Sequence, residues 1–421
     1  MDYKLIACLL MFAAYAWQML LCFLDVRSAV NSIPDSVKDI YNREEYMKWR
    51  RYHAETNRLE MIRLTVSFLT VLLIVFDVYA FFAAKIPDPY WAGVAVVLVN
   101  LLATLLPDTV FSYISNMVIE QKYGFNRRTM KTFILDTVKE TLLSFCLICG
   151  LLCAFIALHI WLNDLIIVVF SAFLFLFILF ISFLYPFFSG IFNHFTPLEE
   201  GELKEKLTRM LEKNGYTVRA VKVMDASRRS TRSNAYFTGF GKMKTIVLYD
   251  TLLSSMTPDE ICAVFAHEMG HGLNRDTLKG QLLSLVNIAL IVVTLWLLVK
   301  EETLYASFGF DRVNYGMAFI LLTECCMPIL GAVLGIFSSY RSRRAEYRAD
   351  RQAVKEGYGE QLTSALKKLA KDNFSNLAPS PLLVRLTYSH PPIADRIHAI
   401  LEEEKKYPAD FKAIPHNSSA R

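Results

Sequence analysis

Residues 256–276 read MTPDEICAVFAHEMGHGLNRD and lie between two long apolar parts of the chain. The stretch carries the signals of a helix N-terminus: Thr257 suits the N-cap, Pro258 suits the first helical position, and Glu260 can complete a capping box. We therefore predict a helix that begins near Pro258 and carries the motif HEMGH. The question is why a mostly apolar chain has two histidines and a glutamate on one helical turn.

The motif places His267 and His271 four residues apart, so both imidazoles leave one face of the helix and can bind the same metal ion. Neutral imidazoles suit Zn²⁺, and a hydrolytic zinc site needs a third protein ligand and an open position for water. Glu268 can accept the proton of that water as it attacks a peptide carbonyl. The motif predicts a catalytic site with one zinc ion per chain, although two surface histidines on a helix are also common.

A third ligand is available in SRRAEYRADRQAV, residues 342–354. Glu346 and Asp350 are four residues apart on a predicted helix and can point to one place. Glu346 would bind zinc, and Asp350 would accept a hydrogen bond from the outer nitrogen of a ligand histidine. The alternative is an ordinary basic helix next to the membrane, in which both carboxylates pair with neighbouring arginines.

The segment YSHPPIADRIHAI, residues 388–400, holds two further candidates. His390 can donate a hydrogen bond to a developing oxyanion, and Arg396 can orient that histidine or bind the substrate's carboxylate or backbone. A histidine before two prolines is otherwise a turn residue, and both readings remain open from spacing alone.

Outside these segments the chain is dominated by apolar runs. The hydrophobic fraction of 54% exceeds that of ordinary globular proteins, and only 20% of the residues are charged. Seven runs are long enough to cross a bilayer as helices. They lie at about 4–26, 63–84, 91–107, 141–162, 165–190, 281–299 and 316–338.

Loop charge predicts the orientation of these runs. Lys and Arg are concentrated between the first and second runs, between the third and fourth, and after the fifth, whereas the alternate loops contain few. Basic loops lie on the cytoplasmic side, so we expect the N-terminus outside, the C-terminus inside and HEMGH facing the cytoplasm. The same asymmetry accounts for the net charge of +5, and no nucleic-acid partner is indicated.

Two acidic residues interrupt the apolar runs, and most cysteines lie within them. Asp77 and Glu324 would be costly against lipid, so each either bonds a neighbouring helix or lines a hydrated chamber. The eight cysteines indicate buried thiols and no disulfide framework, and CLIC at residues 146–149 is better explained in this way than as a redox pair.

A polar segment from residue 196 to about 279 has the composition of a soluble α+β region. It contains a charged helix and short strands, two of them at Ala235–Thr238 and Thr245–Tyr249. We predict four segments. They are an N-terminal membrane region with five transmembrane helices (1–195), a soluble segment carrying HEMGH (196–280), transmembrane helices six and seven (281–338), and a C-terminal segment that completes the zinc site (339–421).

Several motifs in one order resemble a known family. They are FNRRTMKTFILDTVKETLL (125–143), FNHFTPLEEGELKEKL (192–207), SNAYFTGFGK (233–242), HEMGH, the distal ExxxD of residues 346–350 and SHPPIADR (389–396). Over about residues 123–400 the chain resembles the integral-membrane zinc metalloproteases known as type I CAAX prenyl proteases.

The resemblance implies a mainly α, polytopic membrane protein in which seven transmembrane helices form a barrel around a hydrated chamber, closed by a small α+β zinc metalloprotease domain. It implies cleavage near the C-terminus of farnesylated or geranylgeranylated CAAX peptides. His267, His271 and Glu346 would be the zinc ligands, Glu268 the base, Asp350 a partner of a ligand, and His390 and Arg396 contacts to substrate or transition state. Asn234 and Ala235 would lie on an edge strand that pairs with the substrate backbone.

One segment departs from this pattern. The residues GLNRDT after HEMGH look more like a bacterial heat-shock membrane metalloprotease, a group expected to have four spans. We therefore expect an endoplasmic-reticulum membrane protein if the source is eukaryotic and an inner-membrane protein if it is bacterial. Two alternative functions stay open: a quality-control zinc protease that needs no prenyl group, and a non-catalytic lipid-binding membrane protein.

Overall fold

The computed structural model describes residues 2–126, 128–228, 235–238 and 243–408. In this part of the chain helices predominate, and the residues separate into two compact units. The first unit comprises residues 1–26, 52–182 and 281–335, and the second comprises residues 27–51, 183–280 and 336–421. Several borders between the units fall inside long helices, so a single helix can contribute residues to both.

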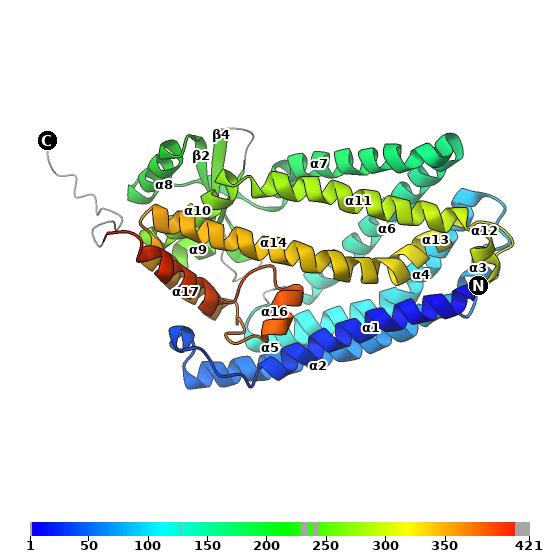
Figure 1. The fold of residues 1–421 in the computed structure, drawn as a ribbon, viewed down its shortest axis with the longest axis horizontal. Helices are drawn as coiled ribbons and strands as arrows, with labels where there is room; N and C mark the ends of the chain where they lie inside the picture. Colours follow the sequence, from blue (N-terminus) through cyan, green and yellow to red (C-terminus); the bar gives the residue numbers. More distant parts are fainter. Residues whose placement is uncertain (1, 127, 229–234, 239–242, 409–421) are drawn as a thin grey trace. The chain divides into compact units, whose positions relative to one another are not determined.

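The first unit is built from helices (Figure 1). Wholly or in part, it contains α1 (Tyr3–Ser28), α2 (Arg43–Val71), η2 (Leu72–Ile74), α3 (Val78–Ala83), α4 (Pro89–Tyr113), η3 (Ile114–Glu120), α5 (Gln121–Tyr123), α6 (Met130–Leu162), η4 (Asn163–Leu165), α7 (Ile166–Phe192), α11 (Asp276–Lys300), α12 (Glu302–Ala306), α13 (Tyr315–Leu321), η6 (Leu322–Cys326) and α14 (Met327–Lys355).

Helix α4 is central to this unit and contacts α3, α6 and α13. A Cβ atom added to Gly316 of α13 would clash with the carbonyl oxygen of Gly93 in α4. Only glycine permits this approach, and small residues at helix crossings are typical of membrane bundles. In the core cluster that includes Val96 of α4 and Met317 of α13, large apolar side chains such as Phe155, Tyr305 and Phe308 are almost fully buried.

Five stretches of the described residues are long and apolar enough to cross a membrane: Tyr3–Ser28, Pro89–Tyr123, Met130–Ser182, Asp276–Lys300 and Tyr315–Lys355. The third has 53 residues, about 80 Å of helix against an apolar bilayer core of about 30 Å. It comprises α6 and the part of α7 up to Ser182, and the helical path between them is interrupted at Asn163, with φ 44°. It therefore contains two of the predicted runs.

The run predicted over residues 63–84 is not one continuous helix. Helix α2 ends at Val71, and Asp77 has a left-handed backbone with φ 57° directly before α3. The Asp77 carboxylate pairs with the ammonium group of Lys4, 2.8 Å away. This charge is therefore compensated by a neighbouring helix of the same unit.

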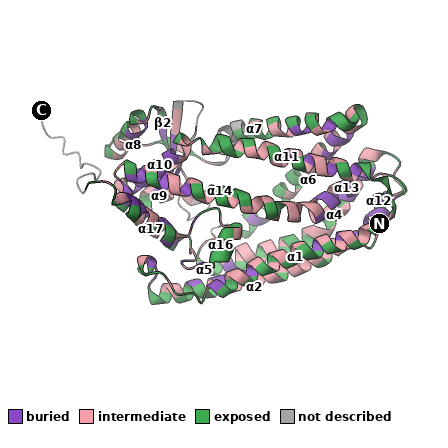
Figure 2. Ribbon diagram, in the orientation of Figure 1, coloured by how far each residue is buried: buried purple, intermediate pink, exposed green. Residues whose placement is uncertain are grey.

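The long helices carry exposed residues along much of their length (Figure 2). Many of these residues are large and apolar: Leu9 and Phe12 on α1, Leu102 and Leu106 on α4, and Leu143 on α6 are all more than half exposed. Bands of exposed apolar side chains on long helices are expected where lipid is the solvent.

The second unit contains the four-stranded sheet and shorter helices. Its elements, besides the parts of long helices that fall within its ranges, are η1 (Asp35–Val37), β1 (Phe195–Pro197), α8 (Glu202–Lys213), β2 (Thr217–Met224), η5 (Ala226–Arg228), β3 (Ala235–Thr238), β4 (Met243–Tyr249), α9 (Asp250–Ser255), α10 (Pro258–Leu273), α15 (Gly359–Asp372), α16 (Pro381–Thr387) and α17 (Ile393–Glu404).

The strand order is β1-β2-β4-β3, with β2 and β4 parallel and the outer pairs antiparallel. The strands predicted at 235–238 and 245–249 are confirmed, the second beginning two residues earlier. Helices α8 and α10 contact the sheet and each other (Figure 1). Leu207 and Leu211 of α8, Phe265 of α10 and Ile246 of β4 are fully buried there, so α10 is held by a packed core on the side away from its histidines.

Candidate active site

Helix α10 begins where the sequence predicts. Thr257 Oγ1 accepts a hydrogen bond from Glu260 N at 3.3 Å, and Glu260 Oε2 accepts one from Thr257 N at 2.8 Å. The Glu260 carboxylate also accepts hydrogen bonds from Ser364 and Lys368 of α15, each 2.6 Å long. The capping box therefore determines where α10 starts and also connects it to α15.

The glycine of HEMGH allows α10 to lie against α14 (Figure 1). A Cβ atom at Gly270 would lie 2.7 Å from the Cα of Ala349 and 3.0 Å from the Cβ of Gln352. Because the backbone of α14 comes this close, Glu346 and Asp350 are brought beside the two histidines of α10. The distal carboxylates and the motif thus meet through one close helix contact.

Three side chains converge at this contact. His267 Nε2 lies 3.5 Å from Glu346 Oε2, and His271 Nε2 lies 3.3 Å from Glu346 Oε1. One ligand atom from each residue lies within 4.8 Å of the others, and Glu346 is only 4% exposed. Two imidazole nitrogens and one carboxylate form the donor set of a catalytic zinc site, so the residues present fit a bound divalent cation.

The outer nitrogen of His267 faces a carboxylate. Its Nδ1 lies 2.8 Å from Asp350 Oδ1, and Asp350 accepts two hydrogen bonds from Arg396, at 2.9 Å from Nε and 2.6 Å from Nη2. If His267 Nδ1 carries the proton that Asp350 accepts, Nε2 is free to bind a cation. Asp350 therefore lies where the sequence reasoning placed it.

Arg396 lies elsewhere than expected for a group that contacts substrate. It is 7% exposed, and its guanidinium group spans Asp350 and, at 3.4 Å, Glu346 Oε2. His390 is different: its side chain is 65% exposed, and its Nδ1 lies 3.0 Å from Glu346 Oε2. The structure thus brings both residues to Glu346, with the histidine open to solvent and the arginine buried.

Glu268 lies between the two histidines in sequence and is partly buried. Burial raises the pKa of its carboxyl group, while the two histidines act in the opposite direction and leave a net upward shift. A carboxylate whose affinity for a proton is increased is a better general base near neutral pH. Its environment therefore suits proton transfer.

One pair of residues at this site was missed from the sequence. Asp276 Oδ2 lies 3.2 Å from His271 Nδ1, and Asp276 Oδ1 accepts a hydrogen bond from Arg348 at 2.9 Å. Asp276 is five residues after His271, a spacing that does not match one helical face. The chain turns through Arg275, with φ 54°, and this turn, which no periodicity predicts, brings Asp276 back to the histidine.

The sequence predicts that Asn234 and Ala235 bind substrate from a strand at the edge of a sheet. Ala235 is in β3, which pairs with β4 on one side and is the last strand in the order. The whole residue is only 2% exposed, so Ala235 is buried in the structure. Asn234 lies outside the described residues.

The long apolar helices and the site formed by two histidines and a glutamate define a class of protein, the membrane metallopeptidases. Comparison with known families agrees: residues 197–404 match the model of peptidase family M48, and residues 24–194 match the model described as CAAX prenyl protease N-terminal, five membrane helices.

Known relatives narrow the class. The chain is 33% identical to CAAX prenyl protease 1 homolog of Arabidopsis thaliana, over 91% of this chain and 95% of that protein. It is 33% identical to CAAX prenyl protease 1 of Saccharomyces cerevisiae, over 73% of this chain and 72% of that protein. The crystal structure of S. mikatae Ste24p superposes with a TM-score of 0.87 at 27% identity, covering 95% of this chain and 99% of that one.

The chain therefore belongs to peptidase family M48, in its CAAX prenyl protease group, and is a multi-pass integral membrane metalloendopeptidase. The resemblance drawn from its motifs is confirmed, and a non-catalytic lipid-binding role is not supported.

Proposed function

We propose that this protein is a zinc endopeptidase that hydrolyses peptide bonds near the C-terminus of prenylated CAAX proteins. The observation that carries the proposal is the convergence of His267, His271 and Glu346 in a chain that spans 95% of a CAAX prenyl protease 1 homolog. A zinc ion held by these three side chains would supply a Lewis acid that polarises the scissile carbonyl and makes water more acidic.

The remaining groups have separate tasks. Glu268 accepts the proton of the attacking water and delivers it to the leaving amine. Asp350 accepts a hydrogen bond from His267 and so keeps its Nε2 directed at the cation, and Arg396 holds Asp350 in place. His390, exposed beside Glu346, donates a hydrogen bond to the oxygen on which negative charge develops.

The substrate backbone pairs with β3, next to Asn234 and Ala235. Backbone pairing gives affinity that depends little on side chains, which suits an enzyme whose substrates differ in sequence near the cut. The place of β3 at the end of the strand order supports this assignment.

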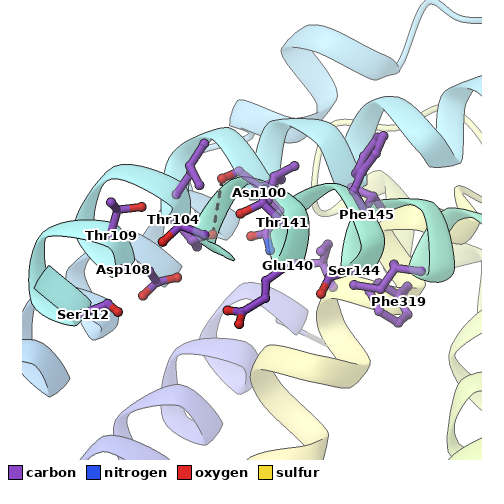
Figure 3. Close-up of a pocket in the computed structure, with 16 residues that line it drawn as sticks. Asn100, Thr104, Asp108, Thr109, Ser112, Glu140, Thr141, Ser144, Phe145 and Phe319 are labelled. Carbon is purple, nitrogen blue, oxygen red and sulfur yellow. Dashed lines mark hydrogen bonds between the residues drawn. The ribbon is translucent and has the colours of Figure 1, made fainter. Parts of the chain in front are cut away.

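Seven transmembrane helices form a barrel around a hydrated chamber in the membrane region. Support comes from a cavity of about 370 Å³ within the first unit, lined by side chains of α4 and α6 (Figure 3). Asn100, Thr104 and Asp108 of α4 and Glu140 and Thr141 of α6 lie around it. Polar and acidic side chains within membrane helices typically pair with one another or line a water-filled cavity, and this cavity has room for water.

A second cavity of about 560 Å³ in the same unit is lined by residues of α1 and α2 as well as α4. Asp108 and Ser112 line both cavities, so polar surface continues along one side of α4. This continuity favours a chamber over isolated hydrogen bonds between helices.

The protein resides in the endoplasmic-reticulum membrane if its source is eukaryotic and in the inner membrane if it is bacterial, with the zinc site on the cytoplasmic side. The concentration of Lys and Arg in alternate loops supports this orientation. The chain is divided into four segments in this proposal. They are a five-helix membrane region (1–195), a soluble segment (196–280), two further spans (281–338) and a C-terminal segment (339–421).

The test is hydrolysis of a fluorogenic farnesylated CAAX peptide by the purified full-length protein in detergent, beside the same peptide without its lipid. We expect cleavage of the lipidated peptide, abolished by a zinc chelator and restored by added zinc. Equal cleavage of both peptides would replace the prenyl requirement with general quality-control proteolysis. Failure to cleave either, with zinc bound, would refute the proposed reaction.

A further inference from the structure

The two histidines of HEMGH have matching surroundings. His267 Nδ1 faces Asp350, which Arg396 holds, and His271 Nδ1 faces Asp276 at 3.2 Å, which Arg348 holds at 2.9 Å. In both cases the Nε2 atom faces Glu346. Each imidazole therefore lies between the shared carboxylate on one side and a carboxylate paired with arginine on the other.

Helix α14 contributes to both arrangements. Within about one helical turn, it presents Glu346 to the cation position, Arg348 to Asp276 and Asp350 to His267. Arg348 is only two residues from Glu346, so a shift of α14 would move the third ligand and the support of His271 together. This places the GLNRD segment, which departs from the family pattern, in contact with the site.

The backbone explains how Asp276 reaches His271. Helix α10 ends at Leu273, and Asn274 caps it by donating hydrogen bonds from its backbone N–H and its side-chain amide to the carbonyl oxygen of Gly270. Arg275 then takes a left-handed conformation with φ 54° before α11 begins at Asp276. This conformation is unfavourable for a residue other than glycine. The hydrogen bond to His271 and the ion pair with Arg348 are compensating contacts on the far side of the turn.

We propose that Asp276 is a positioning residue for the metal site and that Arg348 acts through it. Asp276 accepts a hydrogen bond from His271 Nδ1–H, which fixes the tautomer and ring orientation that leave Nε2 for the cation. Arg348 holds the carboxylate in that position. The inference rests on the proposed metal function of His271 and adds two residues that the motif does not contain.

The support of His271 is the more exposed of the two. The side chains of His271, Asp276 and Arg348 are 24%, 14% and 34% exposed, whereas those of His267, Asp350 and Arg396 are all below 10%. Water competes more effectively for the hydrogen bonds of the exposed group. Substitutions at Asp276 should therefore weaken metal binding while leaving the buried group and the fold intact.

The experiment measures the zinc dissociation constant of the full-length protein in detergent by competition with a chromophoric chelator. We expect Asp276→Ala to weaken zinc binding about 10- to 100-fold, the range typical for outer partners of ligand histidines. Asp276→Asn should fall between this variant and the wild type, because its amide oxygen still accepts a hydrogen bond but has no charge. The matched control is Asp259→Asn, which removes a carboxylate paired with Lys206 at the start of the same ligand helix and should leave zinc affinity unchanged.

A double-mutant cycle tests the role of Arg348. Arg348→Gln should weaken zinc binding in the wild type and have no further effect in the Asp276→Ala background, since the arginine acts through the carboxylate. Additive losses would show that Arg348 does not act through Asp276 and would overturn that part of the proposal.

Thermal unfolding of the metal-free proteins separates positioning from general stability. Equal midpoints for wild type and Asp276→Ala, together with weaker zinc binding, support the proposal. An unchanged zinc dissociation constant overturns the proposal. A weaker zinc affinity accompanied by a lower thermal unfolding midpoint of the metal-free variant overturns it as well. Should Asp276→Ala fail to fold, the isosteric Asp276→Asn carries the same test. A wild-type protein that binds no zinc would instead refute the proposed function on which the inference rests.

Discussion

At the scale of single residues, the site separates metal binding from proton transfer. The three ligand atoms that converge belong to His267, His271 and Glu346. Glu268 is on the same turn of α10 as the two histidines but is not one of these ligands. Burial raises the pKa of its carboxyl group, with the histidines opposing that shift. A base and a metal site on one turn can therefore be removed independently by substitution.

We predict that Glu268→Gln keeps one bound metal ion per chain and loses hydrolysis. The amide has nearly the shape of the carboxylate but accepts no proton, so kcat should fall by about 10²- to 10⁴-fold. Metal content and peptide cleavage are measured on the same preparation. Glu205→Gln, at an exposed ion pair on α8, is the control and should retain full activity; an undiminished rate for Glu268→Gln would remove its assignment as the base.

At the scale of elements, the site depends on how closely α14 approaches α10. Gly270 is where the two helices touch, and the atoms of Ala349 leave no room for a side chain. The sequence shows a glycine in the motif, but only the packing shows what it contacts.

Gly270→Ala should force the helices apart. A Cβ atom 2.7 Å from the Cα of Ala349 is a clash with backbone, so we expect a loss of about 1 to 3 kcal/mol of stability and weaker zinc binding as Glu346 moves away. Gly280→Ala is the matched control, because a Cβ atom there meets nothing within 4 Å and alanine favours the helix. Equal thermal midpoints and zinc affinities for both variants would contradict this account of Gly270.

The capping box of α10 predicts a pH dependence of stability. Burial by itself raises the pKa of the Glu260 carboxyl, but hydrogen bonds from Lys368, Ser364 and the Thr257 backbone outweigh it, so the pKa lies below the ordinary 4.5. A carboxyl whose pKa is lowered by folding contributes stability above its unfolded pKa, and that contribution is lost as the pH falls through the folded value.

Glu260→Gln should therefore destabilise the protein near neutral pH and have progressively less effect below the ordinary pKa of 4.5. Thermal midpoints of wild type and variant, measured from about pH 7 to about pH 3, should converge in acid. A difference that stays constant over the whole range would show that the charge of Glu260 contributes nothing.

At the scale of the whole molecule, charge asymmetry predicts the orientation in the membrane. For labelling, the eight native cysteines are first substituted. A single cysteine is then introduced either at Lys213 on α8 or at Arg312, which follows the sixth predicted run. In sealed membrane vesicles whose cytoplasmic face is outward, an impermeant maleimide should label the Lys213→Cys protein directly and the Arg312→Cys protein only after the membrane is opened. The reverse pattern would invert the proposed topology.

The sequence predicted those features that depend on near neighbours in the chain. Helix α10 and its capping box, the strand at 235–238 and the pairing of histidines on one helical face follow from interactions over a few residues. The break at Asp77, where the second apolar run divides, was not predicted, because hydropathy does not report a left-handed residue. A count of apolar runs is for the same reason not a count of helices.

The sequence by itself determined the class of protein, since apolar runs of bilayer length and an HExxH helix are local patterns with local physical causes. Only the tertiary structure decided the outer support of the site: which carboxylate faces which histidine, that Arg396 is buried against Asp350, and that Asp276 returns to His271 through the turn at Arg275. These contacts join residues whose spacing matches no helical or strand period. The contacts to Asp350 exist because the backbones of α10 and α14 touch at Gly270, and the contact of Asp276 with His271 exists because the chain turns at Arg275. Both depend on the path of the backbone in space, which the periodicity of side chains does not report.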